Sequence, residues 1–182
     1  MAPEDLEEQI EAAEEAADTT QLLTILATCT SHGGNDDWEA ATESALDALY
    51  RLVKGGTAVG AGDALEKIFQ TLEAWKEQEA IVEVAFGCVV ALTSKDDGQQ
   101  KTESIHLALL VELMQSFADE STIQEQACLA VEGLAKSSAA IKEKLVALEE
   151  IKAELAAAKG RISNERNKAY PDRAATALGI TI

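Results

Sequence analysis

The chain has 182 residues, enough for one compact domain with a buried core or for one short repeat array. It has 33 acidic and 15 basic side chains, and the resulting charge of −18 disfavours binding to nucleic acid or to anionic membrane surfaces. The aromatic content of 4% and the presence of only two prolines favour Ala/Leu-rich helices over sheets, so we expect an all-α fold.

The amino-terminal segment alternates Glu and Ala and carries a thin apolar stripe at Leu6, Ile10 and Ala13. This pattern predicts a helix with one narrow buried side and a polar outer side. A repeat array needs such a helix at its end, so we expect residues 1–19 to form an acidic capping helix.

Apolar periodicity predicts further helices along the rest of the chain. Gly33 and Gly34 are expected to end the first of them, and Asp36 or Asp37 to cap the next. The predicted helices lie at residues 21–29, 38–53, 63–75, 77–93, 104–117 and 122–136, followed by helical segments within 137–159 and 163–178.

Two loops have compositions that suggest ligand binding but lack the required motifs. Residues 55–63, GGTAVGAGD, lack the Lys-Ser/Thr ending and the preceding strand of a nucleotide-binding loop, so we interpret them as a linker with Asp63 as a helix cap. Residues 94–101, SKDDGQQK, lack the spaced oxygen ligands of a calcium loop. We therefore expect no metal and no cofactor, and we expect Ser121 to cap the helix that follows it.

The carboxy-terminal third allows two interpretations. Residues 137–159 predict a short helix followed by a longer one, whereas a single long helix with coiled-coil character is less favoured because Lys152 and Lys159 would occupy seam positions. Gly160 is expected to end this region. The last helix either begins near Pro171, which suits a first turn, or is kinked there.

Two apolar stripes recur along the chain with one shared period. The first consists of small residues and begins at Ala45, Ala85, Ala127 and Pro171, at intervals of 40 to 44 residues. The second is bulkier and begins 41 to 43 residues apart, at Leu22, Leu65, Leu107 and Leu148. Helix pairs that repeat every 42 residues or so indicate an α-solenoid.

At these residues the chain resembles the armadillo-repeat family. The segment 121–137, STIQEQACLAVEGLAKS, is similar to the third helix of an armadillo unit, and 141–158, IKEKLVALEEIKAELAAA, is similar to the next first and second helices. The resemblance implies a right-handed solenoid of about four units within a single domain, residues 1–182. The approximate units are 20–54, 61–95, 101–136 and 141–180, and two-helix HEAT units would give nearly the same pattern.

The resemblance also implies protein recognition along a concave face lined by the third helices. Peptide-binding members carry Trp and Asn on this face, but none of the matching positions here is Trp or Asn, which argues against a nuclear-import type of receptor. The expected partner-binding residues are Glu43, Asp47 and Arg51 on the first third helix, Glu83, Gly87 and Val90 on the second, and Glu125, Leu129 and Glu132 on the third. Gly87 could admit a close partner, but tight helix packing is the preferred explanation of its small size.

Cysteine and hydropathy patterns indicate an intracellular protein. Cys29, Cys88 and Cys128 are far apart and form no CxxC pair, which is typical of reduced core cysteines. No apolar run reaches membrane-spanning length, and the start MAPEDLEEQIEAAEE is unlike a secretory or transit peptide. We expect no membrane insertion and a location in the cytoplasm or the nucleus.

No arrangement of residues indicates catalysis. His32 and His106 come from different repeats and have no Cys or His at helical spacing, so neither is a good catalytic or metal-binding candidate. Trp38 and Trp75 could anchor a partner, but we favour the interpretation that they cover the edge of a core. The sequence predicts a protein that is not an enzyme.

Charge distribution suggests which partner such a protein would bind. Residues 1–47 contain 13 acidic side chains and no Lys or Arg, whereas residues 136–173 contain nine basic and six acidic ones. We expect an adaptor or scaffold for a protein partner, with a basic partner favoured electrostatically, although solubility alone would explain the acidity equally well. The alternatives are a chaperone-like regulator of a basic client and, for assembly, either a monomer or weak head-to-tail self-association.

Overall fold

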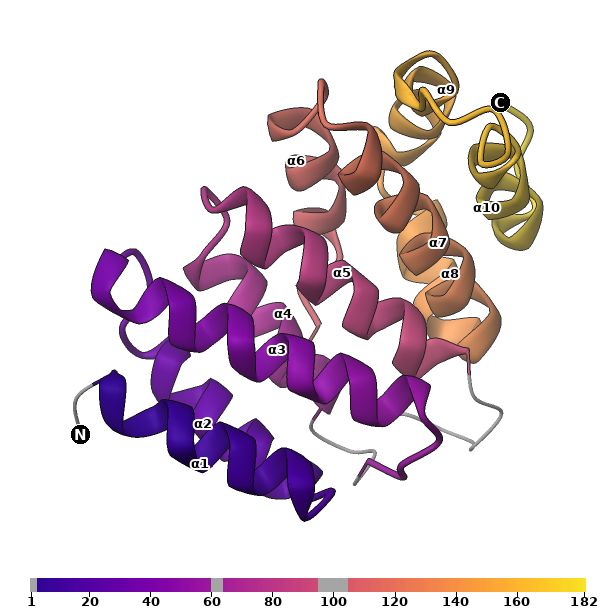
Figure 1. Cartoon of the computed structure of the whole chain (residues 1–182). Coiled ribbons are helices and arrows are strands. Elements are labelled where there is room, and N and C mark those ends of the chain that lie inside the picture. Colours follow the sequence, from indigo (N-terminus) through magenta and orange to yellow (C-terminus); the bar gives the residue numbers. More distant parts are fainter. Residues whose placement is uncertain (1–2, 60–63, 95–104) are drawn as a thin grey trace. The chain divides into compact units, whose positions relative to one another are not determined.

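The computed structural model describes residues 3–59, 64–94 and 105–182, and in these ranges the chain is helical without any strand. The all-α prediction is therefore confirmed for the described residues. They divide into two compact units, one extending to Leu92 and the other comprising His106–Ile182 (Figure 1). Within the described ranges, no helix is both long enough and apolar enough to cross a membrane.

The first unit is built around α2 and α3. α2 packs against α1, α3 and α4, and α1 also lies along α3 (Figure 1). α5 packs on α3, where the buried Cys88 thiol donates a hydrogen bond to the carbonyl oxygen of Leu46 at 3.3 Å. The elements are α1 (Glu4–Glu15), α2 (Thr19–Thr30), the 3-10 helix η1 (Asp36–Trp38), α3 (Glu39–Lys54), α4 (Ala64–Ala74) and α5 (Glu79–Thr93).

The second unit is built around one central helix, α7, which contacts the four other helices of the unit. α9 also packs against α6 and α10. The elements are α6 (Ala108–Ser116), α7 (Ser121–Ser137), α8 (Ala139–Val146), α9 (Ile151–Arg161) and α10 (Tyr170–Leu178). The expectation of a short helix followed by a longer one within 137–159 is confirmed by α8 and α9, and the single long helix is excluded.

The two recurring stripes form the cores of both units. Every residue of the small stripe is buried except Leu52, and every residue of the bulky stripe is buried except Leu148 and the Lys152 that interrupts it. Burial of apolar surface at about 25 cal/mol per Å² is the main favourable term in folding. Each recurrence of the pattern therefore marks a helix that is held in place by its neighbours.

Several helix ends differ from the predicted ones. Neither Asp36 nor Asp37 caps α3, which begins without a side-chain cap; both lie in η1, where the Asn35 side chain accepts the hydrogen bond of the Asp37 amide at 3.1 Å. Ser121 makes no capping bond to α7, and its hydroxyl oxygen instead accepts the amide hydrogen of Ser163 at 2.9 Å.

The carboxy-terminal boundaries also refine the prediction. α9 continues through Gly160 to Arg161, so Gly160 does not end it. α10 begins at Tyr170 with Pro171 in its first turn, which confirms the first of the two alternatives for that proline. The predicted cap Asp63 and nearly all of the loop 94–101 lie outside the described residues.

The turn between α1 and α2 is a Schellman motif closed by an alanine. The amide of Asp18 donates to the carbonyl oxygen of Ala13 at 2.8 Å, and the amide of Ala17 donates to that of Glu14 at 3.0 Å. This motif places Ala17 in the left-handed region at φ 53, the position that glycine usually fills. The same pair of hydrogen bonds ends α10, where Gly179 takes this position at φ 77.

These two matched turns predict opposite stability changes. Ala17→Gly should raise the free energy of unfolding by about 0.5–1 kcal/mol, because glycine removes the steric cost of the left-handed conformation. Gly179→Ala should lower the free energy of unfolding by about 1 kcal/mol. An added Cβ would be in ordinary contact with Lys142 Nζ at 3.7 Å, so the cost would come from the backbone conformation alone. Urea denaturation of both variants checks the two signs, and equal signs would contradict the explanation.

Candidate functional site

The expected contacts on α3 form a charged row that reaches across to α1. Arg51 binds Glu14 in a fork, with Nε–Oε1 at 2.6 Å and Nη2–Oε2 at 2.7 Å, and its Nη1 pairs with Asp47 one turn earlier. The hydrogen bonds from Arg51 lower the pKa of Glu14, and the same bonds raise the pKa of Arg51. Glu43 continues the row toward the start of α3, where it is exposed and forms no ion pair among the described residues.

The expected contacts on α5 lie beside a tyrosine from α3. A Cβ atom at Gly87 would be 3.6 Å from the Tyr50 ring, an ordinary contact distance, so the ring lies over this position but does not require a glycine there. Lys54 donates a hydrogen bond to the Tyr50 hydroxyl at 2.9 Å and lies 5.1 Å from the ring centroid. Glu83 and Val90, one turn to either side of Gly87, are half-buried. This surface of the first unit is therefore continuous from α3 to α5.

The expected contacts on α7 are mostly engaged within the chain. Glu125 accepts a hydrogen bond from Asn167 Nδ2 at 2.7 Å. Glu132 is buried, with Lys136 beside one oxygen and Arg173 Nη2 2.8 Å from the other, an ion pair that lacks hydrogen-bond geometry. Leu129 lies between them and is half-buried. Among the described residues, Glu43 in the first unit is therefore the exposed acidic position of the predicted set for which no ion pair is seen.

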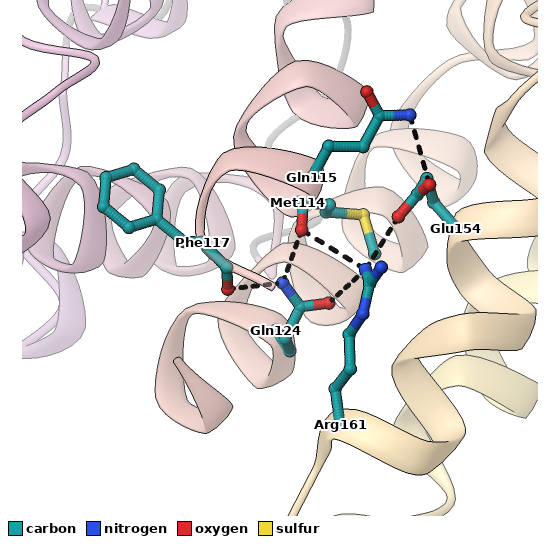
Figure 2. A network of polar contacts seen from close by, with 6 residues as sticks. All are labelled: Met114, Gln115, Phe117, Gln124, Glu154 and Arg161. Atoms are coloured by element: carbon teal, nitrogen blue, oxygen red, sulfur yellow. Dashed lines mark hydrogen bonds and ion pairs between the residues drawn. The ribbon is translucent and has the colours of Figure 1, made fainter. Parts of the chain in front are cut away.

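The second unit also contains a buried polar network that the sequence interpretation missed (Figure 2). Gln124 is fully buried and its Nε2 donates to the carbonyl oxygens of Met114 at 2.8 Å and Phe117 at 3.0 Å. These carbonyls belong to the end of α6, where backbone acceptors have no partner in the helix itself. Gln124 thus caps α6 from a neighbouring helix.

Arg161, at the end of α9, completes this network. Its Nη1 donates to Gln124 Oε1 and to Met114 O, each at 3.3 Å, and pairs with Glu154 Oε2 at 2.7 Å. Gln115 closes the set by donating to the other Glu154 oxygen at 3.1 Å (Figure 2). Spacing could have revealed Gln124, since it lies one turn before the buried pair Ala127 and Cys128.

The two histidines have different surroundings. His32 stacks on Trp38, with ring centroids 3.9 Å apart and planes at 10°, and His106 is an exposed residue of the other unit. Among the described residues, no group of three or more His, Cys, Asp or Glu could hold a metal ion. The polar contacts described above join neighbouring helices within each unit.

The three cysteines are buried free thiols. Burial raises the pKa of Cys128 to about 12, and burial also raises the pKa values of Cys29 and Cys88. With a pKa that high, nearly every Cys128 side chain keeps its proton at pH 8. We expect a disulfide reagent such as DTNB to label the thiols only as fast as the protein opens. Immediate labelling of even one native thiol, with the denatured protein as the reference, would contradict this.

Comparisons with models of protein families, with curated proteins and with solved structures give no match for this chain. The armadillo resemblance therefore depends on two observations, the residue patterns and the burial of both stripes.

Proposed function

We propose that the protein is a non-enzymatic adaptor that holds a partner protein on the surface lined by α3 and α5. The observation that carries this proposal is the row formed by Glu43, Asp47 and Arg51, which runs along α3 next to the Tyr50 ring over Gly87. A half-exposed aromatic ring beside charged side chains is a common composition of protein-binding surfaces. A basic partner fits the unpaired carboxylate of Glu43.

The proposal includes the armadillo-like arrangement. It assigns the units 20–54, 61–95, 101–136 and 141–180 to a right-handed solenoid whose third helices are α3, α5, α7 and α10. Support comes from the shared period of two stripes that are both buried, and from the packing of α10 along α7 within the second unit. The corresponding partner contacts on α7, Glu125 and Glu132, would have to exchange their internal partners, so the first unit is the favoured surface. A location in the cytoplasm or nucleus belongs to the same proposal.

A specific observation favours a second function, a chaperone-like regulator of a basic client. Glu7, Glu8, Glu11 and Glu15 are exposed on α1, and none of these four carboxylates has an ion-pair partner among the described residues. Such a surface attracts a cationic chain over about 8–10 Å at physiological ionic strength. The affinity would then depend on total charge rather than on the position of any single residue.

A crosslinking pull-down from the native source tests the adaptor function. We expect Glu43→Lys to reduce recovery of the captured partner at least about tenfold, because charge reversal at a close interface pair commonly costs more than 1.4 kcal/mol. Glu149→Lys, at an exposed position of the second unit, provides a control with the same charge change. Equal recovery with both variants would reject the α3 surface.

The dependence of partner binding on salt concentration distinguishes the two functions. A client held by the α1 carboxylates should be lost steeply between low and physiological ionic strength, and Glu7→Lys should weaken it as much as Glu43→Lys. An adaptor contact at α3 should survive the salt and respond to Glu43→Lys alone. Sedimentation at two protein concentrations tests the remaining expectation, weak head-to-tail self-association of the acidic and basic ends, which a constant monomer mass would exclude.

A further inference from the structure

α1 is attached to the first unit along one narrow side. Leu6, Ile10 and Ala13 are buried against α2 and α3, while most of the remaining helix is exposed. A long-range ion pair, the fork between Glu14 and Arg51, also joins it to α3. α1 therefore docks through a narrow apolar stripe and the fork to Arg51, and both lie on one side of a 12-residue helix.

α1 is also poorly stabilised by its own sequence. Glu7, Glu11 and Glu15 follow one another at a spacing of four residues, where like charges repel. Glu14 and Glu15 lie in the last turn, which has no basic residue, and the helix dipole disfavours carboxylates at that end. The helix also begins without a side-chain cap. Its helical state therefore depends on docking against α2 and α3.

The turn that folds α1 back onto α2 is short and strained. Only Ala16, Ala17 and Asp18 separate the two helices, and Ala17 is the one non-glycine residue of the described chain with a positive φ. Alanine is the best helix former, and it pays a steric penalty in the left-handed conformation. If Ala17 returns to the right-handed region, the turn can extend into one continuous helix from α1 to α2. Short strained hinges of this kind promote exchange of elements between copies.

We propose that α1 exchanges between two copies of this chain to form a reciprocal dimer. In the open form α1 continues α2 as a longer helix and cannot reach its own docking site. It packs instead on α2 and α3 of the second copy, which presents the same apolar surface. Glu14 of each copy then binds Arg51 of the other copy. This dimer differs from head-to-tail association, because it is closed, symmetric and independent of the basic end.

A charge-exchange experiment tests this directly. Glu14→Arg and Arg51→Glu each place like charges at the fork, so either variant alone should refold as a monomer with α1 poorly docked. The two variants are then denatured together and refolded as a mixture. In an exchanged heterodimer both forks join opposite charges: one contains the two substituted side chains, and the other contains the wild-type Glu14 and Arg51. With one variant labelled with ¹⁵N, native mass spectrometry should show the heterodimer in clear excess over either homodimer.

The control replaces Glu15, the exposed neighbour of Glu14, which has no ion-pair partner among the described residues. Glu15→Arg carries the same charge change but lies outside the fork, so its mixture with Arg51→Glu should give no excess of heterodimer. A mixture of Glu14→Arg and Arg51→Glu that stays monomeric, or equal heterodimer yields with both partners, would overturn the proposal.

The hinge gives an independent measurement on the otherwise unchanged chain. Ala17→Gly relieves the strain of the closed turn and disfavours a continuous helix, so it should weaken dimerisation of the refolded protein. Because each dimer contains two hinges, the dissociation constant should rise at least about 30-fold. Sedimentation of wild type and variant measures this shift, and an unchanged dissociation constant would show that the hinge does not control exchange.

Discussion

Replacing Gln124 by Leu should lower the free energy of unfolding by about 2–4 kcal/mol, because partner groups at the end of α6 lose their hydrogen bonds while remaining buried or half-buried. The Phe117 carbonyl loses the donor that it has in this network, and Arg161 loses one of three acceptors. Leu fills a similar volume, so the loss reports polar contacts rather than a cavity. Urea unfolding followed by far-UV circular dichroism measures the change.

The matched control for this prediction is Gln115→Leu. Gln115 has the same side chain and belongs to the same network, but it is exposed and makes one bond, to Glu154. Its replacement should change stability by no more than about 0.5 kcal/mol, as for most surface positions. If Gln124→Leu were equally neutral, the network would not stabilise the packing of α6, α7 and α9.

The two positions also show why the helices were easier to predict than their polar contacts. Burial at a spacing of three and four residues is a local property, so the sequence predicts that Ala127 and Cys128 face a core. The partners of Gln124 are different: Arg161 lies 37 residues further along the chain, on a helix whose path depends on the packing of the whole unit. A single sequence contains no local pattern that links two positions so far apart.

The same distinction applies to the candidate site. The helical repeat predicted that Glu43, Asp47 and Arg51 share one side of α3, and the pairing of Asp47 with Arg51 follows from that spacing. The fork from Glu14 depends on how α1 docks, and the contacts of Glu125 and Glu132 depend on the path of the segment from α9 to α10. Spacing therefore predicted the side of the helix, whereas tertiary packing decided which carboxylates stay available.

Trp75 should be far more important for stability than an edge residue. Its side chain is only 1% exposed, and we expect Trp75→Ala to lower the free energy of unfolding by about 3–5 kcal/mol through the cavity that it leaves. Its indole Nε1 is buried without a hydrogen-bond partner, which is itself unfavourable. Trp75→Phe removes that N–H while keeping an aromatic ring, so its loss should stay below about 1.5 kcal/mol.

The difference between these two variants separates the roles considered for this tryptophan. An anchor for a partner would leave the unfolding transition of the free protein unchanged in Trp75→Ala and would reduce only the captured partner. A core residue gives the opposite result. Trp75→Ala then lowers the free energy of unfolding strongly and Trp75→Phe only slightly, and partner binding changes only because the protein is less stable. Urea unfolding of both variants, run beside the Glu43→Lys pull-down, distinguishes the outcomes. Equal losses for Ala and Phe would contradict the cavity explanation, because both variants lack the indole N–H and only Phe keeps an aromatic ring.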